Sequence, residues 1–251
     1  MKQYNLFFRH DIKRALSEKG FILGIALLMA VFINCLHQYV RTDGSMSTWE
    51  IIIDAMALSG FGPFAAVFPA LGYSSQFAQE YNSGYLKMIT SRMSWKQYGR
   101  IRILSVGLSG GLIMAVPFSV LMVYAYAVGT HEVPEFIKGT VMEWYLENYG
   151  SGYVLGFRVL LGFLFGVMFS LISLAFAVWS ANRYVAMIAP FILYEALWAL
   201  LPLKVMFLNP IYMVRGDDLG SYPLSAGMEL IYIIIAVVAI WLGMKRRAGQ
   251  E

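Results

Sequence analysis

Residues 74–102 read SSQFAQEYNSGYLKMITSRMSWKQYGRIR and separate two long apolar runs of the chain. The stretch mixes basic and apolar side chains, and it is too polar to cross a bilayer. It therefore predicts a helical segment at the membrane surface, connecting two membrane spans. In a chain that is otherwise buried in the membrane, such a segment is typical of a docking surface for a soluble partner.

The composition predicts a polytopic membrane protein. Hydrophobic residues make up 59% of the chain and charged residues 14%, whereas a soluble domain carries about 25% charged residues. The mean hydropathy is +0.63. The 251 residues leave little room for a separate soluble domain, so we expect one membrane domain over residues 1–251.

Apolar stretches of the length of a membrane span recur along the chain. A bilayer core about 30 Å thick needs about 20 apolar residues as a helix, and lipid offers no partner to a backbone that is not helical. The expected fold is therefore an all-α polytopic membrane protein with six transmembrane helices. These lie at about 21–40, 51–73, 101–128, 153–180, 184–203 and 225–244.

Basic residues set the expected orientation. Most of the 19 Lys and Arg residues fall in the segments 2–19, 87–102 and 245–247. Because Lys and Arg are enriched in cytoplasmic loops, both termini and the polar stretch are expected on the cytoplasmic side. The net charge of +4 follows from this bias and gives no reason to expect a nucleic-acid partner.

The N-terminus predicts an interfacial helix over residues 4–19. Phe8, Ile12, Ala15 and Leu16 share one helical face, and Arg9 lies on another. Apolar residues opposite basic ones suit a helix at the level of the inner headgroups. The alternative is a positively charged flank that only orients the first span.

Proline and glycine predict features of three spans. Pro63 and Pro69 predict a kink or a local break in the second span. Gly107 and Gly111 in the third span, with Gly162 and Gly166 in the fourth, allow helices to approach closely.

Within the polar stretch, the spacing predicts one amphipathic helix from about residue 74 to residue 91. The apolar face is expected to hold Phe77, Tyr81, Tyr85, Met88 and Ile89, and the polar face Gln76, Gln79, Ser83 and Lys87. Ser94 followed by Gln97 matches a capping box. A second helix is therefore expected to begin near Ser94 and to run into the third span.

The sequence contains no phosphate-binding loop of the form G-x-x-x-x-G-K-[ST]. We therefore expect the chain not to be an enzyme, and any ATP-driven work to come from another polypeptide. A helical elbow joined to two spans can transmit that work as a change of helix tilt.

The motif residues of this stretch resemble those of the permease subunits of type-2 ABC exporters. Phe77-Ala78-Gln79-Glu80 with Gly84 is similar to the family pattern F-A-x-E-x-x-x-G, and Ser91-Arg92 and Tyr98 follow it. Six spans and an amphipathic N-terminus agree with the family layout. The chain departs from the family where the third span begins, since Arg100 and Arg102 stand in place of a lysine.

The resemblance implies a coupling segment over residues 74–100 that docks into a groove of a cytoplasmic ABC ATPase subunit. The residues implied in this coupling are Phe77, Glu80, Gly84, Lys87 and Arg92. ATP and Mg would be bound by that partner, with no cofactor in this chain. The resemblance further implies a second permease subunit in a homo- or heterodimer, a bacterial plasma membrane, and export of peptide or another amphipathic or hydrophobic cargo.

Several charged residues leave alternatives open. Glu80 pairs with the partner, pairs with a basic residue of this chain, or is solvated. Glu195 lies in the middle of the fifth span, where it pairs with a donor such as Arg158 or a tyrosine, lines the transport path, or remains protonated. Asp54, Arg158 and Glu229 fall near the outer ends of spans, where snorkelling relieves their cost and no role is needed.

The rival to a permease driven by an ATPase is a secondary transporter or channel that works without one. It predicts more polar residues at mid-membrane and interrupted spans. An intramembrane enzyme has no matching constellation, and a membrane anchor or sensor subunit is a further alternative. His10, His37 and His131 with the single Cys35 make no plausible metal site.

Overall fold

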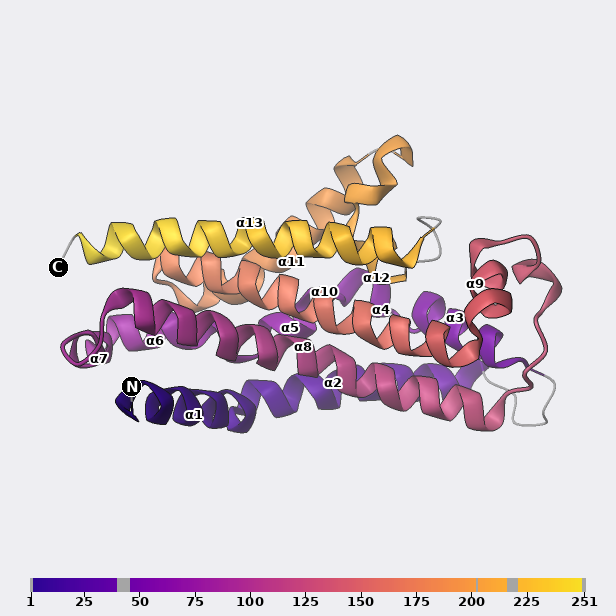
Figure 1. Cartoon of the computed structure of the whole chain (residues 1–251), viewed down its shortest axis with the longest axis horizontal. Helices are drawn as coiled ribbons and strands as arrows, with labels where there is room; N and C mark the ends of the chain where they lie inside the picture. The colour runs from indigo at the N-terminus through magenta and orange to yellow at the C-terminus, as the bar shows by residue number, and fades with distance from the viewer. Residues whose placement is uncertain (1, 40–45, 202, 216–220, 250–251) are drawn as a thin grey trace.

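The computed structural model describes residues 2–39, 46–201, 203–215 and 221–249, and every regular element in these ranges is a helix (Figure 1). Residues 40 and 202, at the ends of the predicted first and fifth spans, lie outside the described residues. The elements are α1 Lys2–Ser17, α2 Lys19–Tyr39, α3 Thr48–Leu58, α4 Phe61–Phe64, α5 Val67–Ala70, η1 Tyr73–Ser75, α6 Gln76–Asn82, α7 Tyr85–Thr90, α8 Trp95–Val128, η2 Glu135–Ile137, α9 Val141–Tyr149, α10 Ser151–Ser180, α11 Arg183–Leu200, η3 Leu203–Leu208, α12 Pro210–Arg215 and α13 Tyr222–Ala248.

The long helices are the candidate membrane spans. Among the described residues, α2, α8, α10, α11 and α13 are long and apolar enough to cross a membrane, and α3 with α4–α5 makes a sixth if the bent pair is one span. These helices run side by side along the long axis of the molecule (Figure 1). An all-helical fold with five or six candidate spans is therefore confirmed.

The second predicted span is broken, as its prolines indicated. The axes of α3 and α4–α5 differ by 57°. The break falls at Ser59–Gly60, just before Pro63, and Gly60 has a φ of 76°. Glycine adopts this left-handed conformation without steric cost, and the hydroxyl of Ser59 accepts a hydrogen bond from the Phe61 backbone N–H at 3.2 Å.

Glycine brings α8 and α10 into backbone contact. A Cβ built on Gly166 would overlap the carbonyl of Gly110, and one built on Gly110 would overlap Ser170. Gly111 and Gly162 face the rings of Phe163 and Phe118 in the same way. The predicted close approach is therefore found, with its tightest point at Gly110, one residue before the predicted Gly111.

The described chain begins and ends at the same end of the molecule, which also holds α6 and α7, while α3 and α9 lie at the other end (Figure 1). The three basic segments of the sequence thus meet at one end, with α1 packed against α8. That this end faces the cytoplasm stays a prediction from the loop charges.

Candidate functional site: a buried ion-pair cluster beneath a surface groove

The predicted coupling helix is two helices. α6 ends at Asn82 and α7 begins at Tyr85, with Ser83 and Gly84 between them. Gly84 has a φ of 74°, the left-handed conformation that commonly ends a helix. The prediction of one helix over residues 74–91 is therefore wrong, because the left-handed conformation of Gly84 ends the first helix and a second helix begins at Tyr85.

The break changes which side chains of this segment are buried. Phe77 is buried and stacks on Tyr81 with ring centroids 6.3 Å apart, as predicted for the apolar face. Past the break, Tyr85 is 47% exposed and Met88 is 62% exposed, while Leu86 is buried. The prediction that Tyr85 and Met88 share the packed face of Phe77 is wrong, because the turn at Gly84 does not preserve the helical phase.

Glu80 is buried and fully engaged within the chain. Its side chain is 3% exposed. Its Oε1 accepts a hydrogen bond from Arg14 Nη1 at 2.7 Å, and its Oε2 accepts from the Tyr98 hydroxyl at 3.0 Å and from Arg102 Nη2. Of the alternatives for Glu80, pairing with basic residues of its own chain is the one found, and a solvated Glu80 is excluded.

Arg102 also pairs with a second carboxylate, that of Asp11 on α1. Its Nη1 lies 3.4 Å from Asp11 Oδ1, and that oxygen also accepts a hydrogen bond from the Tyr73 hydroxyl at 2.8 Å. The guanidinium of Arg102 lies 4.7 Å from the centre of the Tyr73 ring. We call Asp11, Arg14, Tyr73, Glu80, Tyr98 and Arg102 the ion-pair cluster.

The ion-pair cluster ties together four elements from three separate parts of the sequence. Asp11 and Arg14 come from α1, Tyr73 from η1, Glu80 from α6, and Tyr98 and Arg102 from α8. Two carboxylates meet two guanidinium groups, so the formal charges balance. Burial raises the pKa of the Tyr73 hydroxyl above its ordinary value, with Asp11 and Glu80 adding to the rise and Arg102 opposing it.

Sequence reasoning missed the roles of Asp11, Tyr73 and Arg102. The sequence indicates Arg102 only as one of the basic residues of the cytoplasmic side, whereas its side chain is 1% exposed and lies in the cluster. Asp11 is an acidic residue in a basic segment, which is the one local signal that it has a special partner. The partner itself could not be inferred, because Arg102 lies on another helix.

A surface groove covers this cluster. It has a volume of about 990 Å³ and is lined by Leu6, Phe7, His10, Asp11, Arg14, Tyr85, Met88, Ile89, Arg92 and Met93. The lining comes from α1, from α7 and from the turn after α7, so we call it the α1–α7 groove. Its apolar side chains are flanked by Arg14 and Arg92, and the predicted coupling residue Lys87 is exposed nearby on α7.

The helix α6, which carries Glu80, also forms hydrogen bonds near the ends of α10 and α13. Arg247 at the end of α13 donates to the Tyr81 hydroxyl and to the carbonyl of Val178, both at 3.1 Å. The side-chain amide of Asn82 donates to the carbonyl of Ala181 at 2.9 Å. α6 therefore contacts the ends of α10 and α13, in addition to α1 and α8.

The charged residues of the spans differ from expectation. Glu195 is half-buried, and no hydrogen bond or ion pair joins it to Arg158 in the described part of the chain. Arg158 is buried with its Nη1 3.4 Å from the Met56 sulfur. Glu229 is 0% exposed, so the expectation that Arg158 and Glu229 snorkel is wrong: both side chains are enclosed by neighbouring helices.

Among the residues that the structure describes, no group of three or more His, Cys, Asp or Glu side chains could hold a metal ion. No family model, curated protein or solved structure matches this chain. The geometry of the groove and of the ion-pair cluster is therefore what supports a function.

Proposed function

We propose that this chain is the membrane-spanning permease subunit of an ATP-driven exporter, and that a separate cytoplasmic ATPase subunit binds in the α1–α7 groove. The observation that carries the proposal is the exposed apolar surface of α7, with Met88 62% and Tyr85 47% exposed, above a buried cluster of charges. A contiguous apolar surface rimmed by polar residues marks a site of protein or membrane interaction, and Arg14 and Arg92 rim the apolar lining of this groove.

The connections of α7 suit the transmission of force. The chain passes from α7 through a short turn into α8, which continues without a break from Trp95 to Val128. The capping box predicted for this start is present, since Ser94 Oγ accepts from the Gln97 N–H at 3.3 Å. A displacement of α7 would therefore act directly on the third span.

The ion-pair cluster would distribute the same displacement. Glu80 links α6 to α1 through Arg14 and to α8 through Arg102. Because buried charges are costly to separate, these elements would move together as one body. In this proposal the partner binds ATP and Mg, and this chain supplies half of the transport path with a second permease subunit for a peptide or another amphipathic cargo.

A second candidate function is a secondary transporter or channel, and Glu229 is the observation that favours it. Both of its carboxylate oxygens are buried and have no hydrogen-bond partner among the described residues. An ionisable side chain inside a membrane domain is a candidate for an ion or proton pathway. Cargo transport by the purified chain alone in lipid vesicles would favour this function over the ATP-driven one.

Met88→Glu is expected to weaken binding of the ATPase without unfolding the chain. Burial of an apolar side chain contributes about 1.5–3 kcal/mol, so placing a charge there should raise the Kd by at least about tenfold. The measurement is the Kd of the ATPase subunit that co-purifies with the wild-type chain, together with the ATPase rate of the complex.

The matched control is Phe136→Glu, because Phe136 is also exposed, at 57%, and lies in η2 far from α7 along the chain. It should leave both the Kd and the ATPase rate unchanged. Equal binding by the Met88 variant, or a wild-type chain with which no ATPase co-purifies, would contradict the proposal.

A further inference from the structure

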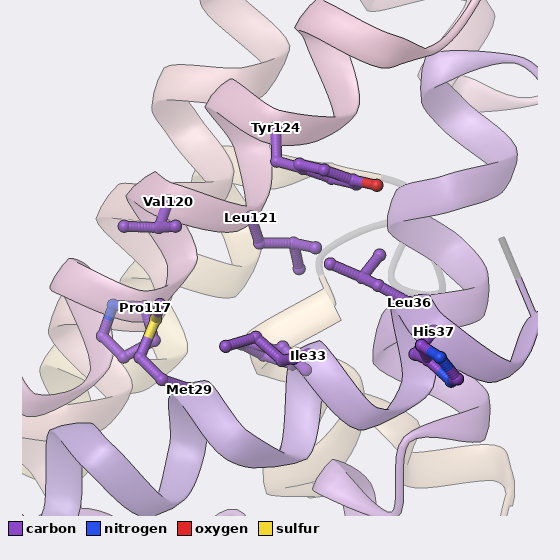
Figure 2. A pocket seen from close by; sticks show the side chains of 9 residues that line it. Met29, Ile33, Leu36, His37, Pro117, Val120, Leu121 and Tyr124 are labelled. Atoms are coloured by element: carbon purple, nitrogen blue, oxygen red, sulfur yellow. The ribbon is translucent and has the colours of Figure 1, made fainter. Parts of the chain in front are cut away.

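An apolar groove opens on the side of the bundle between α2 and α8. Its volume is about 510 Å³, and it is lined by Met29, Phe32, Ile33, Leu36, His37, Pro117, Val120, Leu121 and Tyr124. Figure 2 shows the α2 and α8 side chains facing each other across it, with the His37 ring and the Tyr124 hydroxyl on opposite walls. The other lining residues are apolar. His37 and Tyr124 lie at the end of the groove away from Met29 and Pro117 (Figure 2).

The packing of α2 explains why the groove is there. Near the start of α2, a Cβ on Gly24 would lie 3.0 Å from the side chain of Ile113, so the two helices are in tight contact. Pro117 lies one turn further along α8, and its ring takes the place of a backbone N–H inside the helix. Beyond this point the side chains of α2 and α8 leave a space between them.

The groove faces the bilayer and not the interior of the bundle. Both of its walls are candidate membrane spans, and Ile33 and Val120 on its rim are 57% and 46% exposed. Phe32 and Leu121 form its buried floor. Whatever fills it must therefore come from the membrane.

The length of the groove and its polar end suit a lipid. From Met29 to His37 the axis of α2 advances about 12 Å at about 1.5 Å per residue, close to the hydrocarbon depth of one leaflet, about 15 Å. The walls are apolar along this length, and the polar groups of His37 and Tyr124 lie at one end. A phospholipid has the same arrangement, an acyl chain that ends in a polar headgroup.

We propose that this groove, which we call the α2–α8 groove, is a phospholipid site that holds one acyl chain, with the phosphate of the headgroup beside His37 and Tyr124. The chain lies along Ile33, Leu36 and Val120, and the imidazole and the phenol hydroxyl supply hydrogen-bond donors at the membrane surface. The groove lies along the C-terminal parts of α2 and α8, away from α6 and α7 (Figure 1). It does not depend on an ATPase partner.

Photo-crosslinking with a phosphatidylglycerol that carries a diazirine on one acyl chain tests this site. The purified chain is reconstituted in vesicles that contain the probe, and cross-linked peptides are mapped by mass spectrometry. Crosslinks are expected to concentrate on residues 29–37 and 117–124. The double variant Ile33→Trp, Val120→Trp fills the groove and should lower them by about tenfold, because several buried methylene contacts are lost.

Val123→Trp is the control, because Val123 is 70% exposed on the same helix and does not line the groove. It should leave the crosslinks unchanged. Crosslinks spread evenly over the exposed apolar faces, or equal crosslinking in the filled variant, would show ordinary lipid contact only and overturn the proposal.

Discussion

Arg102→Ala is expected to lower the free energy of unfolding by about 3–5 kcal/mol, the cost of breaking a buried ion pair by removing one partner. The substitution leaves Asp11 and Glu80 buried without the guanidinium that lies between them. The measurement is the thermal unfolding of the purified protein in detergent. Arg100→Ala is the matched control, since Arg100 is exposed on the same helix and should change stability by less than about 0.5 kcal/mol.

A version of the ion-pair cluster without its three buried charges separates electrostatics from packing. The triple variant Asp11→Asn, Glu80→Gln, Arg102→Met removes these three charges together and leaves only the half-exposed Arg14. Removing a buried ion pair as a unit costs far less than removing one partner, because no buried charge is left uncompensated. It should recover most of the stability that Arg102→Ala loses. A triple variant no more stable than the single one would mean that the ion pairs are not what holds α1, α6 and α8 together.

Gly166→Val is expected to destabilise the chain by an amount near the upper end of the usual 1–3 kcal/mol for an overpacked core, or more. Its Cβ would overlap the backbone of Gly110 and the side chain of Met114, and backbone atoms cannot rotate away. α8 and α10 would have to separate along their contact. Thermal unfolding and the fraction of folded protein after size-exclusion chromatography measure the effect.

Gly156→Val on the same helix is the control, because a Cβ at Gly156 would meet nothing within 4 Å. It should be close to neutral, so a pair of variants that lose equal stability would contradict the close contact of α8 and α10. The two positions differ by 10 residues in one helix and share the same change in helix propensity. Their difference therefore reports the packing alone.

Features set by local sequence were predicted well. Ser94 and Gln97 are three residues apart, so the capping box and the start of α8 depend only on neighbouring residues. Pro63 indicated a break in the second span, and a bend of 57° is found there. The long apolar runs gave the candidate spans, because bilayer thickness fixes their length.

Features set by contacts between distant residues were not predicted. Arg14 and Glu80 are 66 positions apart, and nothing in either neighbourhood indicates the other. The burial of Glu229 depends on which face of α13 meets the other helices, and its neighbours in sequence leave that open. The break at Gly84 differs, since glycine is a recognised helix terminator and the signal was in the sequence.

The central proposal is that an ATPase subunit binds at the α1–α7 groove and drives the spans through α7. It is tested most directly by placing a photoreactive amino acid at position 88 in living cells. Position 88 is chosen because the side chain of Met88 is exposed, whereas that of Glu80 is buried. The proposal predicts a cross-linked product that contains a protein with a phosphate-binding loop. Products that contain only lipid, or only proteins without a nucleotide-binding site, would contradict it.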